Sequence, residues 1–152
     1  TWQIGDVYAY RLESEYSREK GFYGKYIIFQ KVGETECWPG HIIPIVVVYR
    51  WIGAEIPRME ELRKLEFLNQ IRPVSLMGRT QEECYHRELV CESEKKIPVT
   101  QLILLGNQKP REKTVVKKGR CNCMGWEKTK INWTIEKETI DLYLAWQEHD
   151  NA

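Results

Sequence analysis

Apolar and aromatic side chains alternate along the first third of the chain with a period of two residues. In residues 4–12, Tyr8 and Tyr10 alternate with small apolar residues, so both faces of this segment carry apolar groups. Residues 25–32 repeat the pattern and lead into Gly33, where the sequence Gly-Glu-Thr-Glu is typical of a turn. We therefore predict two strands here, the second of which ends at the turn.

A run of β-branched residues follows at residues 41–51 and favours a third strand. Isoleucine and valine dominate this run, and their side chains fit strands better than helices. We expect a central strand that begins near Ile45, with Pro44 at its start or edge, because proline cannot donate a hydrogen bond to a ladder. Shorter apolar stretches predict further strands at residues 74–77, 85–91 and 99–105.

Two segments have the 3.6-residue spacing of amphipathic helices. Apolar residues recur at this spacing in residues 59–68 and again in residues 135–148, where Thr134 is a candidate N-cap. The charged stretch at residues 13–20 suits an exposed connection or a short helical turn. We predict a short middle helix and a C-terminal helix.

The predicted elements indicate an α+β fold. Few connections are long enough for repeated βαβ crossovers, which favours a small, mostly antiparallel β-sheet or an SH3-like barrel with the two helices appended. The 152 residues fit a single domain, 1–152. No apolar run approaches the roughly 20 residues that span a bilayer, so we expect no membrane segment. No signal-peptide pattern is present, and the expected location is cytoplasmic.

Charge is balanced over the whole chain but not locally. The net charge is +1, which gives no argument for a nucleic acid as partner. Residues 109–120 nevertheless hold six basic residues and one acidic residue. Among them, Lys117, Lys118 and Arg120 are candidates to bind the phosphates of a nucleotide, although a solvated loop is the simpler interpretation.

Acidic side chains concentrate in two other segments. Residues 81–94 and residues 136–150 each contain five acidic residues against one lysine or arginine. Acidic surfaces of this kind suit a basic protein partner, including a nuclease toxin whose cationic cleft must be blocked. The alternative is that the acidic C-terminal helix pairs with the basic segment of the same chain.

The five cysteines do not form a recognisable metal or catalytic pattern. Their odd number and irregular spacing fit reduced thiols. Cys121 and Cys123, with a Cys-Tyr-His sequence at residues 84–86, are spaced too closely for a typical structural zinc site, so we predict no metal and no other cofactor. Cys37 and His41 are separated by a Pro-Gly turn and are not expected to form a catalytic dyad.

Eleven of the seventeen aromatic residues lie in residues 2–51. We expect pairing of the first two strands to place tyrosines of one strand beside Tyr26 of the other, in a patch continued by Tyr23 and Trp38. At least half of these aromatic residues are expected in the core, and three or four at the surface, where they contact a protein or stack on a base. The predicted binding residues are Tyr8, Tyr10, Tyr23, Tyr26, Trp38, His41, Lys117, Lys118 and Arg120.

The sequences Gly-Asp-Val-Tyr-Ala-Tyr-Arg-Leu at residues 5–12 and Tyr-Gly-Lys-Tyr-Ile-Ile-Phe-Gln-Lys-Val at residues 23–32 resemble the opening of the bacterial immunity protein 26 family. The similarity covers about the first fifty residues. It implies a cytoplasmic protein that binds and neutralises a toxin domain, and it brings no catalytic residues. The same strands are also similar to the SH3-like barrels of MazF-type and PemK-type toxins, but the chain lacks the Arg-Pro that usually opens their second strand.

The sequence thus predicts a non-enzymatic binding protein of immunity type, which occludes a toxin through aromatic and acidic surfaces. Two alternatives remain open. The first is a phage or bacterial protein that binds and sequesters a small molecule or nucleotide. The second is an SH3-like enzyme that acts on RNA.

Overall fold

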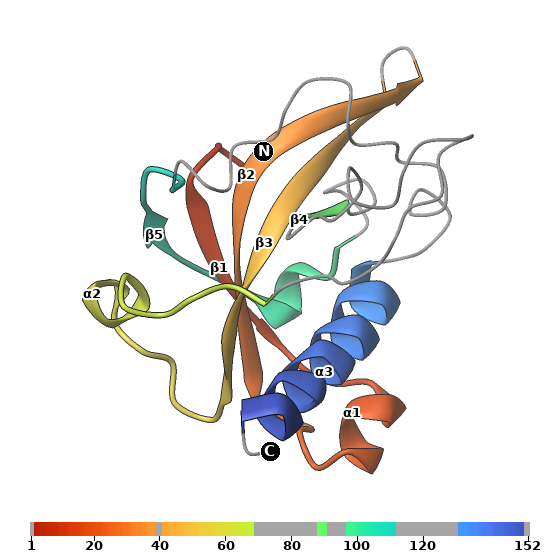
Figure 1. The fold of residues 1–152 in the computed structure, drawn as a ribbon. Helices are drawn as coiled ribbons and strands as arrows, with labels where there is room; N and C mark the ends of the chain where they lie inside the picture. Colours follow the sequence, from red (N-terminus) through yellow and green to blue (C-terminus); the bar gives the residue numbers. More distant parts are fainter. Residues whose placement is uncertain (1, 39–40, 69–87, 91–96, 112–130, 151–152) are drawn as a thin grey trace, which may run out of the picture.

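The computed structural model describes residues 2–38, 41–68, 88–90, 97–111 and 131–150 (Figure 1). In chain order its elements are β1 Asp6–Arg11, α1 Glu15–Glu19, β2 Tyr26–Trp38, β3 His41–Gly53, α2 Met59–Leu62, β4 Glu88–Val90, the 3-10 helix η3 Val99–Gln101, β5 Leu102–Asn107 and α3 Ile131–Asp150.

The strands form one five-stranded sheet in the order β4-β3-β2-β1-β5. Each neighbouring pair is antiparallel. Together with α2 in the middle of the chain and α3 near its end, this confirms the predicted α+β fold with a small antiparallel sheet. Figure 1 shows α1 and α3 beside each other on one side of the sheet, and α2 on the other side.

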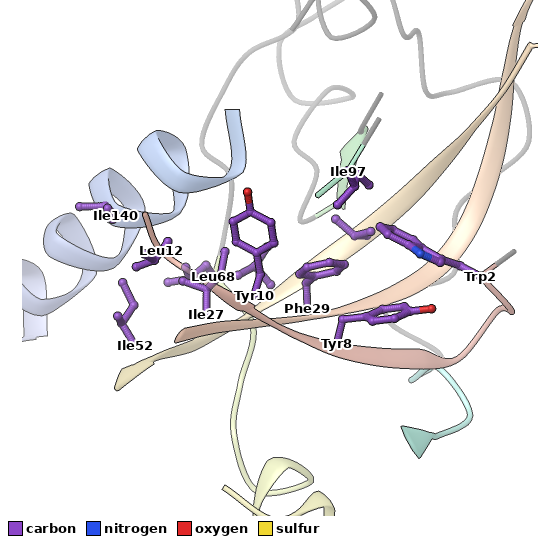
Figure 2. Close-up of a cluster of buried hydrophobic side chains, with 12 residues drawn as sticks. Trp2, Tyr8, Tyr10, Leu12, Ile27, Phe29, Ile52, Leu68, Ile97 and Ile140 are labelled. Atoms are coloured by element: carbon purple, nitrogen blue, oxygen red, sulfur yellow. The ribbon is translucent and has the colours of Figure 1, made fainter. Parts of the chain in front are cut away.

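Both faces of the sheet are covered, and each face has its own core. The first core contains Tyr8, Tyr10 and Phe29, and Ile140 of α3 belongs to the same cluster (Figure 2). The second core lies on the opposite face and includes Leu62 of α2. The two-sided alternation of apolar residues in the sequence therefore reflects a sheet that is buried on both faces.

The predicted turn at Gly33 is wrong, because β2 continues to Trp38. The register shifts between Lys31 and Gly33, and this irregularity lets the ladder continue against the β-branched residues of β3. The third strand accordingly begins at His41 rather than near Ile45. Pro44 lies inside β3 opposite Glu34, in a part of the strand that has β2 as its only described partner.

The predicted helix at residues 59–68 is too long, since α2 ends at Leu62. The chain then turns and runs along β3, where the Leu68 N–H donates to the Val48 carbonyl at 2.8 Å. Phe67 is buried in the second core and Leu68 in the first. Two adjacent residues reach opposite faces of a sheet only in extended backbone, which explains why the helix stops early.

Three further predictions concern the remaining elements. The strand at residues 99–105 begins as η3 and becomes β5, which continues through Asn107. The C-terminal helix begins at Ile131, so Thr134 lies within it and is not its N-cap; no glycine or proline separates the two positions. Within residues 85–91, Glu88–Val90 is a strand, and residues 74–77 lie outside the described part of the chain.

Candidate interaction surfaces

The tyrosine patch predicted from the first two strands does not form at the surface. Tyr8 and Tyr10 are 8% and 1% exposed and belong to the first core. Tyr10 lies opposite Ile27, and Tyr26 lies one position further along, opposite Arg11. A one-residue difference in position reverses the face of a strand, so Tyr26 packs against the second core instead.

Because Tyr10 is buried, its side chain is not available to bind a partner. Desolvation raises the pKa of this phenol, and the nearby Glu136 carboxylate raises it further. The Gln101 side chain acts in the opposite direction and lowers the pKa. Tyr10 is therefore a neutral core residue that orders the sheet.

Tyr23 is the predicted tyrosine that the structure places clearly at the surface. It is 45% exposed and lies in the connection between α1 and β2. The Arg18 guanidinium carbon stands 3.9 Å from the centroid of its ring. Tyrosine and arginine are among the residue types most enriched in binding hot spots, so this pair is a candidate contact site.

The α1 segment contributes further aromatic and basic side chains around this pair. Lys20 lies 5.5 Å from the Tyr16 ring centroid, and Lys25 lies 5.5 Å from that of Phe22. The Tyr16 hydroxyl donates to the Asp141 carboxylate of α3, and this bond raises the pKa of Tyr16 to about 12. We call residues 16–25 the α1 surface. Of this surface the sequence predicted Tyr23 alone, although the other aromatic and basic residues are visible in the chain.

Trp38 and His41 meet at the end of a long hairpin. The two residues are paired where β2 ends and β3 begins. β1 pairs with β2 only up to Gln30, and β4 reaches β3 only from Ile45 onward. In the described structure, residues 34–38 and 41–44 therefore have no strand partner except each other. We call them the hairpin arm.

Figure 1 shows the hairpin arm continuing past the rest of the sheet. Residues 33–45 contain two glutamates and no lysine or arginine, so the arm lacks the positive charge that would oppose a basic partner. The sequence proposed Trp38 and His41 as binding residues, and the fold brings them together.

The edge strand β5 carries a second kind of surface. β5 is last in the sheet order, with β1 as its neighbour. Ile103 is 43% exposed and Leu104 is 57% exposed. Exposed aliphatic side chains on a sheet edge make β5 a candidate site for association.

The acidic residues of the C-terminal helix are partly buried and partly exposed. Glu136 is 3% exposed, and its Oε1 accepts the backbone N–H groups of Glu13 and Ser14, each at 3.0 Å. It is thus not part of an acidic outer surface. Glu148 and Asp150, near the end of α3, are exposed.

Several sequence predictions fall outside the described part of the chain. These include Lys117, Lys118 and Arg120, as well as Cys84, Cys121 and Cys123. In the described residues, no group of three or more His, Cys, Asp or Glu side chains is placed to hold a metal ion. None of the helices described here combines the length and apolar character that crossing a membrane requires.

Comparison with known proteins gave no relative. The chain matches no protein-family model, and neither a curated protein nor a solved structure matches it significantly.

Proposed function

We propose that the protein is a non-enzymatic binding protein of immunity type, which acts in the cytoplasm and neutralises a toxin domain by occluding it with the hairpin arm. The observation that carries this proposal is the arm itself. Its strands extend beyond the flanking strands, with Trp38 and His41 paired at the end. The resemblance of residues 5–12 and 23–32 to the immunity family supports the same function.

A hairpin held by its own ladder is suited to insertion into a cleft. Its backbone hydrogen bonds are already made, so binding costs less conformational entropy than ordering a loop would. A tryptophan at its end supplies the large contact area that binding hot spots use. The arm's two glutamates and its lack of lysine and arginine favour a cationic cleft, such as one that binds a nucleic-acid substrate.

The test is protection from a toxin in the cell. The protein is co-expressed with the toxin domain encoded beside its gene, and growth is measured. We expect the natural protein to restore growth. A variant in which residues 34–44 are replaced by an Asn-Gly turn, which joins the paired residues Gly33 and Ile45, should lose protection but keep its fold.

The matched control is Val99→Ala, which alters an exposed apolar residue outside the arm. Circular dichroism establishes that all variants are folded. Failure of the natural protein to protect against any neighbouring toxin would exclude the immunity function. Full protection by the shortened variant would exclude the arm as the binding element.

A second function is supported by the α1 surface. Arg18 lies over the Tyr23 ring, and Lys20 and Lys25 lie over the rings of Tyr16 and Phe22 in the same segment. The segment thus combines cations that can bind a phosphate with aromatic rings that can stack on a base. This observation supports nucleotide sequestration. Ultraviolet absorbance of a nucleotide, released from the purified protein on denaturation and absent from Arg18→Ala, would favour this function over toxin binding.

A further inference from the structure

The outer edge of β5 offers both backbone and side-chain contacts to another strand. Among the described strands, β1 alone pairs with β5, and it occupies one of the two backbone edges. No residue in the described ranges pairs with the other edge, where the peptide N–H and C=O groups are in extended geometry. An edge strand of this kind accepts a further strand unless charges, prolines or covering elements prevent it.

The exposed apolar side chains of β5 lie on both faces of the sheet. Leu104 is opposite Tyr8 and so lies on the side of the first core. Ile103 is opposite Ala9 and lies on the side of the second core. A helix or small ligand placed on one face would leave the other side chain exposed. An added strand covers both at once, because its side chains also alternate between the faces.

The chemistry of β5 identifies a second copy of the same strand as its complement. Residues 97–108 contain no Asp, Glu, Lys or Arg, in a chain that is 30% charged. β5 is the one described strand without a charged residue, since β1, β2, β3 and β4 each contain at least one. Nothing along β5 therefore repels a second β5, and no charge on it calls for an oppositely charged partner.

The apolar run is also self-complementary in register. Residues 102–105 are Leu-Ile-Leu-Leu. In an antiparallel pair about a two-fold axis at Ile103, this residue faces its own equivalent, and Leu104 faces Leu102 of the second copy. The three central pairs, Leu102 with Leu104, Ile103 with Ile103 and Leu104 with Leu102, then bring apolar side chains together on both faces, while Leu105 faces Gln101.

We propose that two copies of this protein associate through antiparallel pairing of β5, which joins their sheets into one continuous sheet of ten strands. The interface is independent of the hairpin arm. It is small compared with that of obligate dimers, so the association should be reversible and depend on concentration.

The experiment measures the mass of the full chain by light scattering or sedimentation over about a hundredfold range of concentration. We expect a shift from one chain to two as concentration rises. The backbone amides of β5 should become more protected from hydrogen exchange over the same range. Ile103→Lys and Leu104→Lys place a charge on opposite faces of the edge, and each should abolish the shift.

Two variants serve as controls. Trp38→Ala, in the hairpin arm, should dimerise normally, which separates this test from that of toxin binding. Val99→Lys alters an exposed residue just outside β5 and should also dimerise. Circular dichroism establishes whether the lysine variants are folded. If one of them does not fold, the other still tests the proposal. A natural protein that stays monomeric throughout, or dimers that persist in both folded lysine variants, would overturn the proposal.

Discussion

A single carboxylate connects the two ends of the described chain. Glu136 in α3 accepts the backbone N–H groups of Glu13 and Ser14, which would otherwise be unpaired where the chain enters α1. Burial raises the pKa of Glu136, although the hydrogen bonds from these two residues oppose the shift. The residue thus stabilises the junction as an acceptor, while its charge is unfavourable there.

Substitutions at Glu136 separate these two effects. Glu136→Gln keeps an oxygen acceptor and removes the charge, so we expect an unfolding free energy at pH 7 that is equal to or higher than that of the natural protein. Glu136→Ala leaves two N–H groups without a partner and should lower that free energy by about 1–3 kcal/mol. Chemical denaturation of both variants measures the difference.

The pH dependence of stability gives an independent check. A raised carboxyl pKa means that the folded state binds the proton more tightly than the unfolded state. The proton-linked part of the stability is fully present below the ordinary pKa of Glu136, 4.5, and it is lost as pH rises through the raised pKa. Glu136→Gln should remove this part of the decline. An unchanged pH profile in the glutamine variant would contradict the assignment.

At the scale of elements, strand β1 was predictable and its surroundings were not. The alternation around Tyr8 and Tyr10 reflects local two-sided burial, which the sequence displays directly. The end of α2 depends on β3, because Leu68 bonds to Val48 far away in the fold rather than continuing a helix. The spacing of apolar residues cannot show whether the Leu68 N–H bonds within a helix or to a strand.

The candidate sites were also predictable only in part from the sequence. Trp38 and His41 could be proposed as residue types, but their pairing required β2 to continue through a sequence that is typical of a turn. The burial of Tyr10 and the separate face of Tyr26 depend on strand register, which residue preference does not determine. The contact between Arg18 and Tyr23 joins α1 to the connection that follows it, so the pattern of neither segment alone predicts it.

The start of β1 depends on one glycine. Gly5 has φ +97°, and a Cβ atom there would lie 2.6 Å from the Gln108 carbonyl oxygen. Gly5→Ala should therefore lower the unfolding free energy by about 3 kcal/mol or more, from backbone strain and overpacking together. Gly21, at φ +83° with open space around it, is the matched control, and Gly21→Ala should cost only about 1 kcal/mol. Equal costs in thermal denaturation would refute the steric argument.

At the scale of the whole molecule, one sheet is shared by two cores. Ile140 in the first core and Leu62 in the second are both fully buried, on opposite faces. Because the strands between them belong to both cores, loss of packing on either face should weaken the same cooperative unit.

We expect Ile140→Ala and Leu62→Ala each to lower the free energy of a single unfolding transition by about 2–5 kcal/mol. Far-ultraviolet circular dichroism and tryptophan fluorescence should report the same midpoint. Trp2 in the first core and Trp51 beside the second place a probe on each side. If either variant unfolded in two separate transitions, the two faces of the sheet would unfold independently.

The contact between Glu136 and Glu13 spans 123 positions of the chain, and this distance matters during synthesis. A ribosome makes β1, β2 and β3 long before it makes α3, so the first core lacks Ile140 throughout that interval. The first face of the sheet is completed only after the helix has left the exit tunnel. Folding of this protein is therefore completed after most of the chain has been synthesised, and a nascent chain stalled before residue 131 should recruit chaperones that bind exposed apolar surface.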